Sequence, residues 1–450
     1  MVSLNWKGFT VLAVVVGSII LFVFQMDRQQ QQTDDVNDNV VSESVVNSST
    51  AKTDLPDTMP TTNTPQVQGS PLADKLAPGT TLPPGHRALT DMSPARSTAV
   101  ANSEAFNKAH SKFTHFQIGN RNVKSIHTAE GAVWVGTSGG AIRYDTKSNE
   151  YQLYNVRNGL LANGVFDIST VNDKIAVGTY GGGLAILDDT VKQWKIYNVP
   201  EGLGDAFVYQ TLQMSNGDIW IATWTGANRI KAGKLDDPQA WEIYTVENTN
   251  GGVPNDWVYG LAEGKNGELW MATEGGLARF SDNTWSNWKH SDGLGAAYEK
   301  VRDQNPFKND PAKFSSHHAR QKVEQGLQDV DTAYNPNYII ALVVDDEGYV
   351  WAGTWGAGLA RFDGKTWKNY TMDDGLPANH VFMLYKDDKN NLWVGTSKGL
   401  TRFDAQRSVF KNFTKADGLF SEVVFSMTID SEGTYWIGSF GGVAKIKYLN

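Results

Sequence analysis

Apolar and polar residues alternate in a short pattern that recurs along most of the chain. In LWVGTSKGLTRFD, from Leu392 to Asp404, an apolar run ends at Gly395-Thr396, a short turn contains Gly399, and a second apolar run follows. Two apolar runs joined by a short turn with Gly predict a β-hairpin. Related stretches, which bring the number of copies to seven, begin at Val133, Ile175, Ile219, Leu269, Val350, Leu392 and Tyr435.

Each copy has the same neighbours, and together they predict a four-stranded unit. A short apolar strand precedes the hairpin, and a strand with two aromatic residues three positions apart follows it. Because successive side chains of a strand point to opposite faces, the two rings of a pair lie on opposite faces, and one sheet alone cannot bury both. The pairs are Tyr151 and Tyr154, Trp194 and Tyr197, Trp241 and Tyr244, Trp285 and Trp288, Trp367 and Tyr370, and Phe410 and Phe413.

The spacing of the copies predicts the architecture. Successive copies lie about 42 to 50 residues apart, with one gap near twice that length, which is the period of a four-stranded propeller blade. A seventh aromatic pair is missing after the last hairpin and occurs at the front instead, as Phe113 and Phe116. The sequence therefore predicts an all-β fold, a seven-bladed β-propeller, with the last blade closed by the N-terminal strand so that no sheet edge stays open.

Composition narrows the functional classes. The 450 residues are 40% hydrophobic and include 44 Gly and 15 Trp, which suits a large all-β domain with many turns. The net charge of −9 argues against a nucleic-acid surface, which needs a basic stripe. Because the chain has no Cys, it has no disulfide, no haem-attachment motif and no thiolate metal site. No cofactor is expected.

The first residues predict a membrane anchor. The run from Gly8 to Phe24 is uncharged and lies at the short end of the length that spans a bilayer. A cleaved signal peptide is the alternative, but the residues after the run offer no small-residue cleavage site. Lys7 precedes the run and acidic residues outweigh Arg28 after it, which favours a cytoplasmic N-terminus. We expect residues 1–28 to form an uncleaved single-pass signal anchor in the inner (cytoplasmic) membrane, with the propeller in the periplasm or otherwise outside the cytoplasm.

Two further segments lie outside the repeats. Residues 29–111 are polar, with no aromatic residue before Phe106, and cannot bury enough apolar surface to offset their ordering entropy, so we expect a disordered tether before a propeller at 112–450. Residues 295–337, between the fourth and fifth copies, contain no Trp and no Gly-Thr turn and predict an insertion with a helix start at Asp310-Pro311. This insertion is predicted to be a lid or a partner-docking arm over the channel mouth, and a surface excursion without function is the alternative.

Candidate ligand-binding residues follow from the repeat. In a propeller, the turns of these hairpins and the loops that enter the inner strands share one face. Aromatic rings with a few polar groups on such a face suit a carbohydrate, a peptide or another small ligand. The alternative is that the rings only fill the channel or cover the ends of the blades. The candidates are Tyr180, Trp224, Trp257, Glu274, Trp355, His380 and Phe440.

Signs of metal binding and catalysis are few. His317 and His318 are adjacent, hence on different faces of a helix, and have no acidic partner at ligand spacing, so no metal site is predicted. No nucleophile elbow or phosphate-binding loop occurs, and no catalytic residue is predicted. A recurring Asp-Gly-Leu motif is interpreted as a turn, in which Asp caps and Gly supplies a positive φ. Its copies begin at Asp292, Asp374 and Asp417.

The repeat resembles the two-component regulator propeller repeat. The unit LWVGTSKGLTRFD, followed by VFKNFTKADGLF and VVFSMTIDSEG, carries the resemblance, which covers Phe113 to Asn450 apart from the insertion. In that family, the propellers form periplasmic sensor regions of hybrid histidine kinases and commonly sense carbohydrate-derived or other extracellular ligands. No kinase, receiver or DNA-binding segment follows the propeller in these 450 residues, so we do not expect the signalling of that family from this polypeptide itself.

Three functional hypotheses follow. The first is a membrane-tethered extracytoplasmic propeller that binds a ligand or an envelope protein and is sensory or accessory to a separate membrane protein. The second is a structural or assembly scaffold of an envelope complex. The third is an enzyme, since lyases that act on antibiotics also use seven-bladed propellers with loosely similar repeats. An enzyme would need a His and a carboxylate that meet over the channel, for which His380 and Glu422 are the pair to test.

Overall fold

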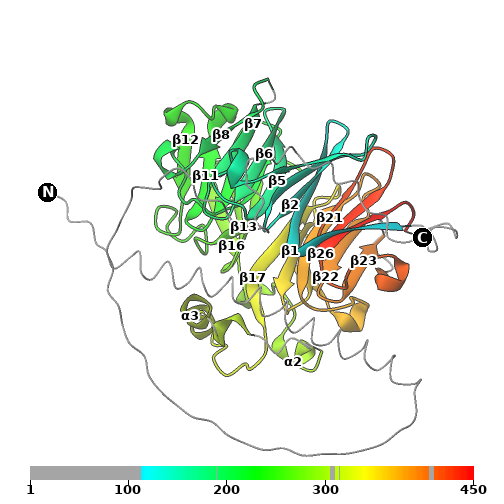
Figure 1. Ribbon diagram of the computed structural model, residues 1–450. Helices are drawn as coiled ribbons and strands as arrows, with labels where there is room; N and C mark the ends of the chain where they lie inside the picture. Colours follow the sequence, from blue (N-terminus) through cyan, green and yellow to red (C-terminus); the bar gives the residue numbers. More distant parts are fainter. Residues whose placement is uncertain (1–112, 189, 305–309, 314, 405–409, 450) are drawn as a thin grey trace, which may run out of the picture. The chain divides into compact units, whose positions relative to one another are not determined.

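The computed structural model describes residues 113–449 apart from 189, 305–309, 314 and 405–409 (Figure 1). Their strands form six antiparallel sheets, five of four strands in sequence order and one of six. The four-stranded sheets are β5 (Val165–Val171), β6 (Lys174–Thr179), β7 (Leu184–Asp188) and β8 (Gln193–Tyr197); β9 (Val208–Gln213), β10 (Ile219–Thr223), β11 (Gly226–Ile230) and β12 (Trp241–Tyr244); β13 (Val258–Glu263), β14 (Leu269–Thr273), β15 (Gly276–Ser281) and β16 (Thr284–Trp288); β17 (Asn335–Val344), β18 (Val350–Trp355), β19 (Leu359–Phe362) and β20 (Trp367–Tyr370); and β21 (Val381–Lys386), β22 (Leu392–Thr396), β23 (Gly399–Phe403) and β24 (Phe410–Phe413).

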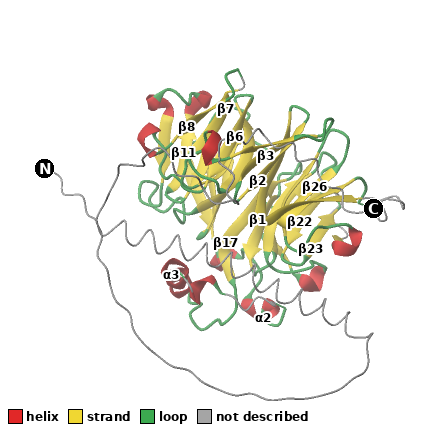
Figure 2. Cartoon of the chain, viewed as in Figure 1, coloured by secondary structure: helices red, strands yellow, loops and turns green. Residues whose placement is uncertain are grey.

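The sixth sheet joins the two ends of the described chain. Its order is β25-β26-β1-β2-β3-β4, formed by β1 (Phe113–Ala129), β2 (Ala132–Thr137), β3 (Gly140–Asp145), β4 (Tyr151–Tyr154), β25 (Val424–Ile429) and β26 (Tyr435–Ile446). The innermost strands contact one another in the closed order β1, β5, β9, β13, β17, β21, β25 and back to β1. Figure 2 shows that strands dominate this arrangement and that the helices are short and peripheral. The predicted all-β propeller is confirmed.

The predicted number of seven blades is wrong. The structure has five separate four-stranded blades, and the strands expected for the first and last blades share the six-stranded sheet. The physical reason is that β1 continues from one group of strands into the other: its first part pairs with β26 and its last part, from Val123, pairs with β2. Two shifts of register mark the passage, one between Gln117 and Asn122 and one between Val123 and Ser125. The hairpins of the first and seventh repeats therefore lie in one sheet.

Aromatic rings hold adjacent sheets together, as the spacing of the pairs predicts. Tyr244, the second ring of its pair, stacks on Trp220 of its own hairpin with ring centroids 5.4 Å apart. The same Tyr244 ring lies 5.3 Å from Trp285, the first ring of the next sheet. Equivalent contacts join Tyr154 to Trp194 and Tyr370 to Phe410. Each pair therefore contributes to two interfaces.

The N-terminal strand supplies the missing pair where the two ends meet. The register of β1 with β26 runs from Phe113↔Ile446 to Gln117↔Gly442. Phe116 stacks on Trp436 at 5.7 Å and 21°. Phe113 packs on Gly418, which has a φ of 108°, and a Cβ there would lie 2.6 Å from the ring. The expectation that the N-terminal strand pairs with the C-terminal end is confirmed.

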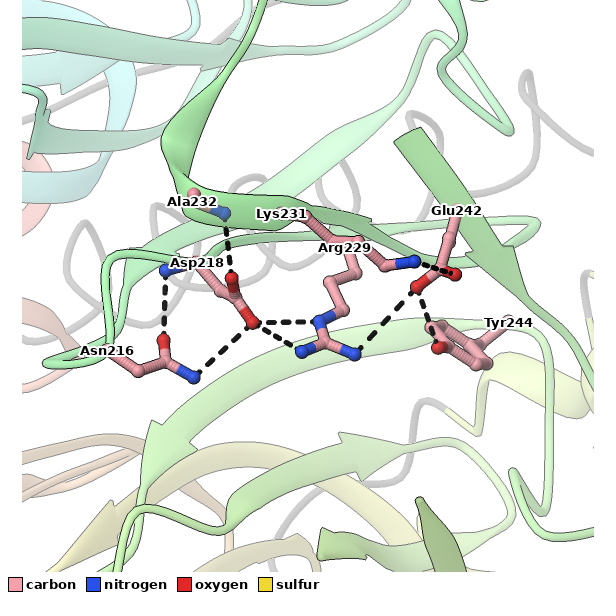
Figure 3. Close-up of polar contacts among 7 residues, drawn as sticks. All are labelled: Asn216, Asp218, Arg229, Lys231, Ala232, Glu242 and Tyr244. Carbon is pink, nitrogen blue, oxygen red and sulfur yellow. Dashed lines mark hydrogen bonds and ion pairs between the residues drawn. The ribbon is translucent and has the colours of Figure 1, made fainter. Parts of the chain in front are cut away.

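The end of each sheet opposite the hairpin turns carries a buried or half-buried carboxylate. In the sheet β9–β12, Asp218 accepts hydrogen bonds from Arg229 Nε (2.8 Å) and Nη2 (2.6 Å) and from the backbone N of Ala232 (2.8 Å). Figure 3 shows this network, which ties the β9–β10 turn to β11 and β12. In three other sheets a Trp indole N–H donates to the Asp that begins the turn, six residues before the Trp, in the pairs Asp345–Trp351, Asp387–Trp393 and Asp430–Trp436.

The Asp-Gly-Leu motifs form the predicted turns. Each Asp ends a short 3-10 helix, and its carboxylate accepts a hydrogen bond from the backbone N–H three residues earlier, as Asp374 does from Thr371 at 2.8 Å. The Gly that follows has a positive φ, 107° at Gly375. The 3-10 helices are η1 (Val156–Asn158), η2 (Val199–Glu201), η3 (Lys231–Gly233), η4 (Pro238–Ala240), η5 (His290–Asp292), η6 (Pro311–Lys313), η7 (Met372–Asp374) and η8 (Lys415–Asp417).

The insertion lies between β16 and β17. Its described part contains α2 (Tyr298–Val301), η6 and α3 (Ser316–Glu324). Val301 and Tyr334 are buried in a small apolar cluster with Ala296 and Ala357, which anchors the base of the insertion on the sheet β17–β20. Figure 1 shows α2 and α3 beside the end of β17.

Among the described residues, no helix is long and apolar enough to cross a membrane. The predicted anchor, residues 1–28, and the predicted tether, residues 29–111, lie outside the described part of the chain.

We predict that Phe116→Ala lowers the free energy of unfolding by about 2–3 kcal/mol, because it removes an aromatic ring from the packing that closes the ring of sheets. Urea denaturation of the full-length chain measures the change. Tyr151→Ala is the matched control, since Tyr151 is also an aromatic strand residue of the same sheet but is 53% exposed. Equal losses in the two variants would show that the closing strand contributes no special stability.

Candidate functional site

A fully buried carboxylate lies at the face where the hairpin turns converge. Glu274 follows β14 and is 0% exposed. Its backbone N donates to the carbonyl oxygen of Trp257 at 3.1 Å, and the turn is fixed by a hydrogen bond from the Thr273 hydroxyl to the Gly276 carbonyl at 2.7 Å. The turn thus holds Glu274 against the loop that enters β13. A buried carboxylate is very unfavourable unless it is paired and hydrogen-bonded.

The partners of Glu274 come from the insertion. His317 Nε2 donates to Oε2 at 3.0 Å, and His318 Nδ1 donates to Oε1 at 2.6 Å. Tyr259 Oη of β13 lies 3.3 Å from Oε2 and donates to it. No acidic partner occurs at ligand spacing in the sequence, but the fold brings one to both histidines from 43 and 44 positions away. Adjacent helix positions do diverge, but the two oxygens of one carboxylate are far enough apart for each imidazole to reach one.

The electrostatics of this group favour the ion pair. Burial raises the pKa of Glu274, but the charge of His318 and the hydrogen bonds from His317 and His318 outweigh it and lower the pKa from 4.5 to about 2. Burial lowers the pKa of His318, but the charge of Glu274 and its hydrogen bond outweigh that effect and raise the pKa above 6.5. Asp310, which is buried and pairs with Lys322, raises it further. An ionised Glu274 therefore faces a protonated His318 over much of the acidic range.

Three of the candidate residues form one aromatic array beside this carboxylate. Trp224 stacks on Phe207 at 4.3 Å and 10° and on Trp257 at 4.8 Å and 7°. Trp257 in turn stacks on His317 at 3.7 Å and 13°. Tyr180 meets Phe207 edge-on at 4.7 Å, and burial raises the pKa of its hydroxyl to about 12. The row therefore runs from Tyr180 to α3.

Two further candidates lie on the other side of α3. The ring of His318 stacks on Tyr338 at 5.9 Å, and Tyr338 stacks on Trp355 at 5.6 Å. His380 meets Trp355 edge-on at 5.3 Å, and its Nε2 lies 2.8 Å from the carbonyl oxygen of Ala333. Burial lowers the pKa of His380 to about 4, against the effect of that hydrogen bond. Phe440 lies elsewhere, where β26 pairs with Asn122 of β1.

These rings pack on one another rather than line an open funnel. Trp224 is 4% exposed, Trp355 is 8% exposed, and Glu274 and His380 are 0% exposed. Only Tyr180, Trp257 and Phe440 of the seven candidates are half-buried. The side chains at this face are thus packed as expected if the rings fill the channel, which was the alternative to a ligand-binding funnel. The helix α3 lies over them.

A second aromatic layer escaped the sequence-based reasoning. It is formed by the residue after the buried Val or Ile near the start of each innermost strand. Phe166 and Tyr209 lie 4.6 Å apart, Tyr209 and Tyr259 4.8 Å, and Lys124 Nζ lies 4.4 Å from the ring of Phe425. The recurrence of an aromatic residue at this position was the available signal. The full set is Lys124, Phe166, Tyr209, Tyr259, Ile340, Phe382 and Phe425.

No group of three or more His, Cys, Asp or Glu side chains able to hold a metal ion occurs among the described residues. The two imidazoles contact Glu274 directly at hydrogen-bond distance, which leaves no space for an ion between them. An open groove lies at the other end of β13 and β17 and contains none of the predicted residues. It is lined by Ser215, Glu263, Gly264, Lys265, Gly267, Val344, Asp345 and Asp346.

Comparison with protein families identifies the repeat. The model of the two component regulator propeller matches residues 252–275, 333–356, 375–398 and 418–441. The chain carries two-component regulator propeller repeats. Each matched stretch runs from the turn before an innermost strand to the turn of the hairpin, and together they contain Trp257, Glu274, Trp355, His380 and Phe440. His317 and His318 of the insertion lie outside all four matches.

Solved structures share the fold of these regulator propeller repeats. The extracellular domain of the hybrid two-component system BT3049 from B. thetaiotaomicron is 18% identical with a TM-score of 0.56, over 74% of this chain and 41% of that chain. Virginiamycin B lyase from Staphylococcus aureus is 13% identical with a TM-score of 0.53, over 75% of this chain and 99% of that chain. PorZ, a surface component of the type-IX secretion system of Porphyromonas gingivalis, is 17% identical with a TM-score of 0.50, over 72% and 46%.

The described chain thus corresponds to about two fifths of the BT3049 domain. At these identities the likeness concerns the fold alone. No curated protein matches the sequence.

We predict a pH-dependent contribution from the pair His318–Glu274. The pKa of His318 is raised in the folded state. The contribution of this residue to the free energy of unfolding is therefore complete below pH 6.5 and is lost as the pH rises through the raised pKa. The pKa of Glu274 is lowered from 4.5 to about 2. The contribution of this residue to the free energy of unfolding is therefore present above pH 4.5 and is lost as the pH falls through about 2. His318→Ala should therefore destabilise the protein more at pH 5.5 than at pH 8.5, by about 2 kcal/mol for a charge-assisted hydrogen bond.

Scanning calorimetry of the full-length chain at the two pH values measures this difference. His127→Ala is the control, because His127 Nε2 bonds the uncharged Thr170 hydroxyl at 2.8 Å and burial lowers the pKa of His127. That variant should show the opposite trend. A His318→Ala effect that is equal at both pH values would contradict the prediction.

Proposed function

We propose that this protein is a membrane-anchored, extracytoplasmic binding propeller whose recognition face is the one that carries Glu274 and is covered by α3. In this proposal it binds a ligand or a protein partner and is sensory or accessory to a separate membrane protein. The uncharged N-terminal run and the polar residues 29–111 support the anchor and the reach of the propeller from the membrane.

The observation that carries the proposal is how α3 is attached. The buried side chains of α3 are His318, Gln321 and Lys322, all polar, and its Val323 is 63% exposed. A helix of nine residues has little stability of its own and normally depends on an apolar face that packs on the rest of the protein. Here α3 depends on ion pairs and stacked imidazoles instead. The strength of such a contact depends on pH and on competing charges. This dependence suits a helix that is displaced when a ligand binds.

The placement of the insertion supports the same function. Its base is fixed by buried apolar residues, whereas α3 touches the propeller through a charged group. Lys322 holds α3 to the rest of the insertion, through Asp310 and through the carbonyl oxygen of Thr332 at 3.2 Å. The base of the insertion is therefore fixed to the propeller, whereas α3 is held to the rest of the insertion by contacts within it. In this proposal α3 can leave the face without losing those contacts.

A structural or assembly scaffold is the second candidate function. Exposed apolar side chains follow the outer strands of the first two repeats: Val156 is 51%, Leu161 59% and Val199 53% exposed. Exposed apolar residues grouped on loops favour protein contacts. PorZ, similar in fold, is a component of a secretion system. The two functions predict different contact surfaces, the loops at Val156 and Val199 for a scaffold and α3 for a receptor.

We propose a non-catalytic role. His380 bonds the Ala333 carbonyl, and its lowered pKa, about 4, keeps it neutral near pH 7. Glu422 accepts a hydrogen bond from the backbone N of Lys415 at 3.2 Å, so the two groups of the catalytic hypothesis are engaged with different partners. The lyase similarity, at 13% identity, concerns the fold.

The proposal predicts that a photo-crosslinking residue at Val323 captures a defined membrane or envelope component in living cells. A benzophenone amino acid at this position would project from α3 without disturbing a buried contact, since Val323 is 63% exposed. The measurement is the crosslinked band after irradiation, identified by mass spectrometry, with the full-length chain in its native host.

The same amino acid at Val191 is the matched control, because Val191 is a valine of similar exposure, 59%, in the β7–β8 turn. A band specific to Val323 supports recognition at α3. A band specific to Val156 or Val199 but absent at Val323 would favour the scaffold. Identical bands from Val323 and Val191 would refute a specific role of α3.

A further inference from the structure

The surroundings of Glu274 have the composition of a site for an organic cation. The carboxylate is 0% exposed, and the rings of Trp257, Tyr259 and Tyr338 stand around the two imidazoles that it binds. A cation over an aromatic face is attracted by the negative charge density of the ring, and aromatic boxes with a carboxylate are used to bind ammonium groups. The box belongs to the propeller, since these residues lie in or next to β13, β14 and β17.

The groups that occupy this box come from the chain itself. The ring of His317 lies flat on Trp257 at 3.7 Å and 13°, and the ring of His318 lies edge-on to Trp257 at 5.9 Å and 87° and stacked on Tyr338. Both donate to Glu274. His318, whose pKa is raised by Glu274, is the buried cation, and Asp310 on the insertion adds to the negative field around it. The two imidazoles of the insertion thus make the contacts with Glu274 and the rings that a bound ligand would make.

The remaining charged groups near the box do not compete for this role. Lys322 is the other cation buried on α3, and it is bound to Asp310 and to carbonyl oxygens of the insertion. Tyr259 and Tyr338 are kept neutral, because burial and the Glu274 charge raise the pKa of both hydroxyls. Without α3, Glu274 would keep only the Tyr259 hydroxyl among the partners described above, and a buried carboxylate with so few partners strongly favours a cation.

We propose that Glu274, Trp257, Tyr259 and Tyr338 form a binding site for an organic cation, an ammonium or guanidinium group, which α3 occupies with His317 and His318 until an external cation takes their place. This inference rests on the proposed function in that α3 must leave the face for the external cation to bind. A positively charged group on flat rings, rather than a sugar, is then the class of ligand that this face selects.

The double variant His317→Ala/His318→Ala of the full-length chain tests the site. It removes both imidazoles and leaves the carboxylate and the rings in place. Free imidazole, added at pH 5.5 where it is a cation, should raise the melting temperature of this variant in a saturable way, by about 2 °C or more at saturation. Sodium chloride at the same ionic strength is the reference for general salt effects.

Two comparisons assign the effect to the box. Adding Glu274→Gln to the double variant should abolish the imidazole response, because the charge that attracts the cation is gone. The unaltered protein should need at least tenfold more imidazole for half of the response, since its own histidines compete from within the molecule. A response that is the same with Glu274 and with Gln at this position would overturn the proposal.

The single variant His317→Ala keeps the test decisive if the double variant fails to fold. The side chain of His317 is 21% exposed, and its loss uncovers one face of Trp257 while His318 and its ion pair stay. Tetramethylammonium should then change the Trp fluorescence saturably, and Glu274→Gln should weaken its binding at least tenfold. No binding beyond that of sodium chloride in this variant would overturn the proposal.

Two probes distinguish between the two possible sources of the natural cation. Methylguanidinium represents a free small molecule, and the peptide Gly-Arg-Gly represents a side chain of a partner polypeptide. Tighter binding of the first assigns the site to small amines, and tighter binding of the second to a protein. If neither probe nor imidazole binds while Val323 still crosslinks to a partner, the ligand class is wrong and the proposed function stands.

Discussion

No sheet of this protein can bury its apolar side chains alone, and the rest of the structure follows from that constraint. Each outer strand carries rings on both faces, so that Tyr244 packs on Trp285 of the next sheet and Trp241 lies against Tyr197 of the preceding sheet. Such a surface is satisfied only when every sheet has a neighbour on each side, which requires a closed ring. The order in which the innermost strands touch, from β1 through β25 and back to β1, is the geometric solution. The strand at Phe113 closes it.

The centre of the ring shows what happens when a charge is placed among these apolar contacts. Most of the inner positions are aromatic and pack on one another, but Glu274 introduces a carboxylate into the same layer. It can be tolerated only with cations or donors at hydrogen-bond distance. The repeats supply one donor, Tyr259, and the insertion supplies two. The insertion is therefore part of the electrostatic balance of the propeller core.

The architecture was accessible from the sequence because it is periodic. The spacing of the hairpins, the aromatic pairs and the displaced pair Phe113 and Phe116 each predict a contact that the structure contains. The division into sheets was less predictable, since nothing in the sequence shows that β1 runs without a break from one group of strands to the next. The contact between Glu274 and His317–His318 was inaccessible for a different reason: it joins a repeat residue to a segment with no periodicity, over 43 and 44 positions. A single Glu in a turn position that elsewhere holds Ser, Tyr, Trp or Phe was the one signal, and it was used only to name Glu274 as a candidate.

The seam between β1 and β26 also sets the order in which the molecule can be completed. His115 is made early and bonds the carbonyl oxygen of Gly418, 303 positions later. During synthesis, the strand from Phe113 to Gln117 therefore has no partner until β26 has been made. Contacts so distant in sequence are slow to form, because the closure entropy of the whole intervening chain precedes any gain. The C-terminal strand β26 thus completes the fold, and a chain cut short before it leaves the first part of β1, Phe113 to Gln117, without a partner.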